Sequence, residues 1–192
     1  MRSITSEVRV SRAWILTALG KDRPGIVAQV TEVLFRLGCN LEDSAMTRLT
    51  GEFAIMLVFS APHRFTQSQL ERAFAGVSGR LQLALHIKAL SRTERQPSTR
   101  GQPYLLSVYG ADRPGIVYRV SALLARLKIN ITDVSTHRAT RATGRTAPLY
   151  LMLLEVELPS RITATRLERQ IRSLTKKLGV AASLRSADTQ VL

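Results

Sequence analysis

The residues of this 192-residue chain whose types and spacing best suit ligand binding lie in two short turns of nearly the same sequence. The first reads Gly20-Lys21-Asp22-Arg23-Pro24-Gly25-Ile26, and the second reads Gly110-Ala111-Asp112-Arg113-Pro114-Gly115-Ile116. Glycine permits positive φ or a close backbone approach, proline fixes φ, and we expect each aspartate to accept hydrogen bonds from the first free N–H groups of a following helix. Such an N-terminus also suits a carboxylate, because it presents unpaired N–H groups and the positive end of the helix dipole. The turns therefore predict either a well-capped structural turn or an anion-binding site.

An asparagine follows each turn at the same interval. Asn40-Leu41 and Asn130-Ile131 each stand at the expected start of a strand. An Asn amide offers both a donor and an acceptor, so it could hold a ligand's amino or carboxylate group. Turn chemistry after a helix explains an Asn equally well.

These residues belong to an internal repeat, because residues 16–43 align with residues 106–133 without a gap and Arg48 recurs as Arg138. Each half shows apolar runs, alternating segments and two stretches of helical periodicity in the order βαββαβ. We expect an α+β protein of two ferredoxin-like domains, each a four-stranded antiparallel sheet with two helices on one face. The first domain is expected at residues 1–90, a polar linker at 91–102 and the second domain at 103–192.

The sequence also gives approximate element bounds. In the first half we expect strands at 14–19, 40–49, 53–59 and 81–87, a helix that starts at Pro24 and ends before Gly38, and a helix that starts with a capping box from Thr66 to Gln69. In the second half we expect strands at 104–109, from 130, at 149–158 and at 180–184, a helix at 114–127, a second helix before the last strand, and a mobile loop at 139–148.

At these residues the chain resembles the ACT domain, a small-molecule regulatory module whose signature is an Asp-Arg-Pro-Gly turn after the first strand and an Asn at the start of the second. Residues 17–27 with 38–44 resemble in particular the tandem-ACT glycine cleavage system transcriptional repressors. The resemblance implies ACT sheets packed side by side and an amino acid, glycine or another small one, held between one domain's turn and its neighbour's second strand. It nominates as ligand-binding residues Gly20, Asp22, Arg23, Pro24, Gly25 and Ile26 facing Asn130 and Ile131, and Gly110, Asp112, Arg113, Pro114, Gly115 and Ile116 facing Asn40 and Leu41.

The same resemblance implies a regulatory protein that modulates a protein partner, with a role in transcriptional control of amino-acid metabolism, and it leaves a homodimer open. We expect no enzyme, no metal and no cofactor, because His63, His86 and His137 share no metal-ligand spacing and no Ser, Cys or carboxylate stands in a recognisable nucleophile setting. Cys39 is the single cysteine, which excludes an intramolecular disulfide and favours a small buried residue in a reducing compartment. With no apolar run long enough to span a bilayer and no secretory segment, a cytoplasmic protein without membrane contact is expected, unless Arg2, Ser3 and Ser6 begin a short organelle-targeting segment.

The net positive charge suggests an alternative interpretation of the function. The chain has 28 Lys and Arg against 14 Asp and Glu, and 14 of the basic and six of the acidic residues lie in 103–192. RNA-recognition modules share the βαββαβ order, so a basic nucleic-acid-binding protein is the alternative. Their third strand carries base-stacking aromatics, of which this chain keeps one in each half, Phe53 and Tyr150. We therefore expect non-specific, salt-sensitive contact with nucleic acid rather than sequence recognition.

Overall fold

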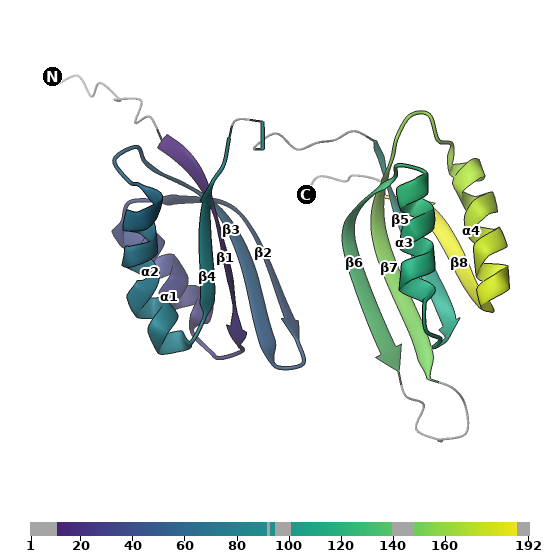
Figure 1. The fold of residues 1–192 in the computed structure, drawn as a ribbon, viewed down its shortest axis with the longest axis horizontal. Helices are drawn as coiled ribbons and strands as arrows, with labels where there is room; N and C mark the ends of the chain where they lie inside the picture. The colour runs from purple at the N-terminus through teal and green to yellow at the C-terminus, as the bar shows by residue number, and fades with distance from the viewer. Residues whose placement is uncertain (1–10, 92, 95–100, 140–147, 188–192) are drawn as a thin grey trace, which may run out of the picture. The chain divides into compact units, whose positions relative to one another are not determined.

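Each half of the chain folds in the predicted order βαββαβ (Figure 1). The structure is a computed structural model that describes residues 11–91, 93–94, 101–139 and 148–187. The chain divides between Pro97 and Ser98 into two units. The first contains β1 (Ser11–Lys21), α1 (Ile26–Arg36), β2 (Asn40–Leu49), β3 (Glu52–Pro62), α2 (Gln67–Leu81) and β4 (Ala84–Ala89). The second contains β5 (Gln102–Ala111), α3 (Ile116–Arg126), β6 (Asn130–Ala139), β7 (Leu149–Leu158), α4 (Ala164–Leu178) and β8 (Val180–Ser186).

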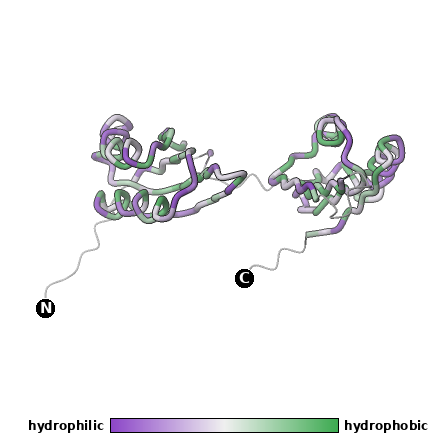
Figure 2. The backbone as a smooth tube through the Cα atoms, turned by 90° about the horizontal axis from the view of Figure 1, so that it is seen from below, coloured by the Kyte–Doolittle hydropathy of each residue, from purple (hydrophilic) through white to green (hydrophobic). Residues whose placement is uncertain are grey.

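Each unit is one antiparallel sheet with both helices on the same face (Figure 1). The strand orders are β2-β3-β1-β4 and β6-β7-β5-β8, so β2 and β6 form sheet edges. Alternate residues of the central strands face the helices, and Trp14, Leu57 and Phe74 of the first core are each at most 1% exposed. Hydrophobic and hydrophilic stretches accordingly alternate along the tube (Figure 2). The predicted α+β, ferredoxin-like fold is confirmed, with a separate core in each unit.

Local signals set several element ends. Thr66 and Gln69 form the predicted capping box at the start of α2. Gly38, at φ 68°, follows the end of α1 as predicted. Thr50 (φ 48°) and Gly51 (φ 81°) form the two-residue hairpin turn between β2 and β3, for which positive φ at both residues matches the twist of the strands.

Some bounds differ from the expectations. The helix expected from Pro24 begins at Ile26, because Gly25 takes a left-handed conformation that interrupts the helical backbone. The strand expected at 81–87 begins at Ala84, since α2 continues through Leu81 and ends at left-handed Gln82. β5 already begins at Gln102, inside the expected linker, where it pairs with Leu158. Residues 92 and 95–100 of that linker and 140–147 of the expected loop lie outside the described residues.

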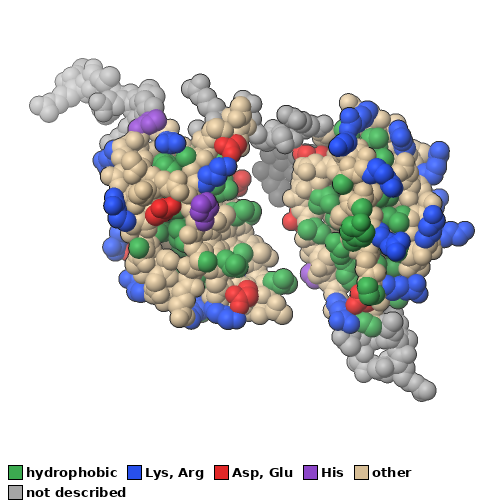
Figure 3. All heavy atoms as spheres, in the orientation of Figure 1, with side chains coloured by type: hydrophobic (Ala, Val, Ile, Leu, Met, Phe, Trp, Pro, Cys, Tyr) green, Lys and Arg blue, Asp and Glu red, His purple; other side chains and the backbone are tan. Residues whose placement is uncertain are grey.

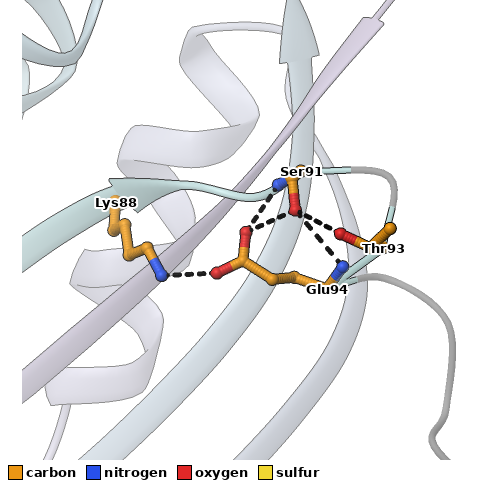
Figure 4. Close-up of polar contacts among 4 residues, drawn as sticks. All are labelled: Lys88, Ser91, Thr93 and Glu94. Carbon is orange, nitrogen blue, oxygen red and sulfur yellow. Dashed lines mark hydrogen bonds and ion pairs between the residues drawn. The ribbon is translucent and has the colours of Figure 1, made fainter.

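The first residues of the expected linker form a hydrogen-bonded turn (Figure 4). The Ser91 hydroxyl and backbone N–H donate to Glu94 Oε2 at 2.7 and 2.8 Å, and Lys88 Nζ donates to Glu94 Oε1 at 2.6 Å. The hydrogen bonds from Lys88 and then Ser91 lower the pKa of the Glu94 carboxyl to about 2. The charged carboxylate thus holds the end of β4 to the turn.

This turn is expected to depend on pH. Because the pKa of Glu94 is lower in the folded protein than its ordinary value of 4.5, its contribution is present above that value and is lost as the pH falls through about 2. An NMR titration of the Glu94 carboxyl carbon should therefore give a midpoint near 2. In Lys88→Met the midpoint should rise toward 4.5, and an unchanged midpoint in that variant would argue against the Lys88 contact.

Candidate functional site

Both signature turns end in a glycine that leaves the following helix open. Gly25 (φ 89°, ψ 0°) and Gly115 (φ 90°, ψ 0°) are the N-cap residues of α1 and α3, and neither helix has a side-chain cap. A Cβ on Gly25 would find only Gln29 Nε2 within 4 Å, at 3.7 Å. An L side chain rarely adopts this backbone conformation, so glycine is required here by φ and not by crowding. The first-turn N–H groups of each helix are left for another acceptor.

The aspartate of each turn does not cap the helix, so that expectation is wrong. Asp22 Oδ2 instead accepts a hydrogen bond from Arg48 Nη1 at 3.2 Å, and Asp112 Oδ2 forms an ion pair with Arg138 Nε at 2.9 Å. The left-handed glycine becomes the N-cap in its place. The aspartate pairs instead with an arginine near the end of the edge strand β2 or β6, which is separated from β1 or β5 by one strand. The ion pair therefore ties the turn to that strand.

The arginine of each turn reaches the far end of the second helix in its unit. Arg23 Nη2 donates to Gln82 Oε1 at 2.8 Å, and Arg113 Nη1 donates to the Leu178 carbonyl at 3.3 Å. A cation at a helix C-terminus is favourable because of the helix dipole. Both arginines thus position the turn against α2 or α4.

The first glycine of each turn allows a close approach between strands and helix ends. A Cβ on Gly20 would lie 2.8 Å from Leu83 Cδ2 and 2.9 Å from the Gln82 carbonyl oxygen. A Cβ on Gly110 would lie 2.9 Å from Val180 Cγ1. These two predicted ligand residues therefore have a packing role.

The predicted asparagines lie on the edge strands, at the other end of the sheet from the turn of their own unit. Asn40 pairs with Ser60, which pairs with Ala13 at the start of β1, whereas the turn follows the end of β1. All ten residues of β2 are exposed, including Leu41. Asn130 is also exposed, and its Nδ2 donates to Glu157 Oε2 at 3.3 Å. The structure thus does not bring each Asn to the turn of the same unit.

A hydroxyl that the sequence did not single out lies beside the second turn. Tyr150 pairs with Gly110 as Phe53 pairs with Gly20, so only the second unit has a phenol at this position. The Tyr150 hydroxyl is buried without a hydrogen-bond partner. Burial, and then the negative charge of Asp112, raise the pKa of this phenol. The sequence does show this difference, because Tyr150 stands in the second repeat where the first repeat has Phe53.

The two aromatic residues also bear on the nucleic-acid alternative. Phe53 is 2% exposed in the first core, and Tyr150 packs against the second core. Their rings therefore lie among the helix-facing side chains and do not form a stacking surface on the open face of the sheet. This arrangement does not support an RNA-recognition module.

Two other features of the described residues concern chemistry. Among them no three His, Cys, Asp or Glu side chains are grouped as metal ligands, and no helix combines the length and apolar character needed to cross a bilayer. Cys39 is half-buried and packs against the first core. Its burial raises the pKa of the thiol despite the nearby Arg64 cation, as suits a packing residue.

Comparison with known proteins agrees with this architecture. An ACT-domain family model matches residues 13–88, and a second ACT-domain model matches residues 104–159. The glycine cleavage system transcriptional repressor of Escherichia coli is 26% identical over 170 residues, covering 88% of this chain and 87% of the relative. A UPF0237 protein of Streptococcus mutans is 35% identical over 75 residues, which cover 39% of this chain and 85% of the relative.

Two solved structures share the fold over nearly the whole chain. A crystal structure of an unknown protein from Galdieria sulphuraria has a TM-score of 0.80 at 24% identity and covers 93% of this chain and 99% of that one. A crystal structure that bears the glycine cleavage repressor name has a TM-score of 0.68 at 20% identity, covering 92% and 97%. With one ACT-domain match in each unit and the βαββαβ order in both, the chain belongs to the ACT-domain family and carries two ACT domains in tandem.

Proposed function

We propose that this protein is a non-catalytic regulator that binds an amino acid, glycine or another small one, and passes the signal to a protein partner in the transcriptional control of amino-acid metabolism. The ACT membership and the repressor name of the Escherichia coli relative support this role. The observation that carries it is the pair of open helix N-termini at Gly25 and Gly115. We include a cytoplasmic location, because the amino-acid pool and the transcription machinery that it would connect are found there.

The ligand's carboxylate binds the first-turn N–H groups of α1 or α3, where the positive end of the helix dipole favours an anion. An aspartate two or three residues away would repel that carboxylate if its charge were free. The ion pairs of Asp22 with Arg48 and of Asp112 with Arg138 offset this repulsion. Each turn thus keeps a positive helix end beside an ion pair that occurs in both units.

The ligand's remaining polar groups bind the Asn of a neighbouring ACT domain, because each Asn is remote from the turn of its own unit. The residues proposed for the carboxylate lie in the turns from Gly20 to Ile26 and from Gly110 to Ile116, and those proposed for the remaining groups are Asn130 with Ile131 and Asn40 with Leu41. The exposed edge strands β2 and β6 are the elements that carry these residues.

A thermal-shift screen of the twenty amino acids against the full chain tests the proposal. A ligand that binds only the folded protein should stabilise it by about 2.7 kcal/mol at one hundred times its Kd. Saturable stabilisation by one small amino acid is expected. Stabilisation by none of them would contradict an amino-acid regulator.

For the amino acid so identified, Asn40→Ala or Asn130→Ala should weaken binding by about 1–3 kcal/mol, roughly five- to hundredfold, because a ligand group loses its partner. Calorimetry measures the loss. The exposed Thr47, near the far end of β2, supplies the control, and Thr47→Ala should bind normally. Unchanged affinity in both Asn variants would remove the asparagines from the site.

A further inference from the structure

The helix layers of the two units share one architecture but differ in charge. α1 and α2 carry three basic and two acidic residues, whereas α3 and α4 carry seven basic residues and a single acidic one, Glu168. All seven cations are exposed, and none has an ion-pair partner among the residues that the structure describes. They are Arg119, Arg126, Arg166, Arg169, Arg172, Lys176 and Lys177. Figure 3 shows basic side chains, in blue, around a hydrophobic area, in green, on the second unit.

In the first unit, two of the three helix cations have side-chain acceptors on α1. Arg36 Nη2 donates to Glu32 Oε1 at 2.6 Å within α1. Arg80 Nη2 of α2 reaches Gln29 Oε1 of α1 at 3.4 Å. The fold therefore forms this helix pair with nearly balanced charges and with acceptors for Arg36 and Arg80.

In the second unit, the same positions no longer supply these partners. α3 matches α1 in length and α4 matches α2, so Ala122 stands where Glu32 stands and Arg119 stands where Gln29 stands. Arg126 and Lys177, at the positions of Arg36 and Arg80, consequently have no acceptor among the described residues. The charge is thus not a requirement of the fold.

Three of the seven cations line a groove of about 360 Å³ between α3 and α4. Its apolar lining comes from Ala122, the buried Leu123 and the half-buried Leu174. Tyr118 also lines it and is 76% exposed, where the first unit has Ala28. The groove therefore combines apolar walls with Arg119, Arg126 and Lys177.

We propose that this groove, the α3–α4 groove, docks an acidic polypeptide segment of a partner protein, with an apolar side chain between the helices and carboxylates on the cations. Docking into a helix groove uses such apolar anchors, and complementary charge adds specificity and speeds association. Single-stranded nucleic acid would instead need successive stacking rings, and Tyr118 is the one aromatic residue of α3 and α4. This proposal rests on the proposed function, because it names the surface at which the regulator contacts its protein partner.

The test measures fluorescence anisotropy of a labelled amphipathic peptide of leucine and glutamate with the full chain at low salt. The wild-type protein should bind it saturably and should bind the matching leucine–glutamine peptide much more weakly. Arg119→Gln with Ala122→Glu, which installs the residues of the first unit, should weaken binding by at least about tenfold. The fold should persist, since α1 already carries both residues at these positions.

Arg169→Glu is the matched control, because it changes the net charge equally on the exposed surface of α4 and does not line the groove. It should weaken peptide binding much less than the double variant. Equal losses, no binding by the wild type, or preferential binding of a short DNA duplex at this groove would each overturn the proposal. Amino-acid binding measured on the single variant Ala122→Glu should be retained, which separates failure of the groove from failure of the ligand site.

Discussion

Replacing Phe74 by alanine is expected to lower the free energy of unfolding of the first unit by about 3–5 kcal/mol. Phe74 lies on α2, is 0% exposed and belongs to the first core. Removing the ring leaves a cavity that the surrounding side chains fill only in part. Urea unfolding followed by Trp14 fluorescence measures the loss, because Trp14 is the single tryptophan of the chain and is buried in the same core.

Phe35→Ala is the matched control, because it removes the same ring from the surface and leaves no cavity. Phe35 lies on α1 with 82% of its surface exposed, so Phe35→Ala should change the free energy of unfolding by no more than about 0.5 kcal/mol. Comparable losses in the two variants would mean that α2 does not pack on the sheet as described.

The second large effect is expected at Gly20. A Cβ there would lie 2.9 Å from the Gln82 carbonyl oxygen, a backbone atom that cannot move without shifting the connection between α2 and β4. Gly20→Ala should therefore cost about 1–3 kcal/mol of the free energy of unfolding. The same urea titration with Trp14 fluorescence measures it.

Gly76 is the matched control, because it lies inside α2 and a Cβ there would meet nothing within 4 Å. Gly76→Ala should stabilise the unit by about 0.5–1 kcal/mol, since alanine favours the helix. A Gly20→Ala protein of normal stability that fails to bind the amino acid would return Gly20 to the ligand site.

Signals confined to a few neighbouring residues were enough to predict most of this fold. The spacing of Ile26, Val30 and Leu34 marks the buried side of α1, and Thr66 with Gln69 marks the start of α2. The same local reasoning failed at Asp22, because its partner Arg48 is distant in the sequence and reaches it only once β2 has joined the sheet. The buried hydroxyl of Tyr150 was overlooked for the same reason, since its position opposite Gly110 depends on strand pairing.

The edge strands contain an irregularity that the alternation of residue types did not indicate. Asn40 and Leu41 pair with Ser60 and Phe59, but Asp43 pairs with Val58, so one extra residue is accommodated between Leu41 and Asp43. The same shift occurs between Ile131 and Asp133 in the second unit. Such a bulge disrupts the ladder locally and changes which residues oppose one another.

This bulge determines which residues of the edge strand beyond it face the helices and which face away. A regular ladder from Asn40 would place Thr47 opposite Phe53, whereas the observed register places Arg48 there, on the side where it meets Asp22. Arg138 is opposite Tyr150 for the same reason. Gain or loss of a single residue between Asn40 and Arg48 would turn one of them to the wrong face, so this exposed edge should be far less tolerant of insertions and deletions than its accessibility suggests.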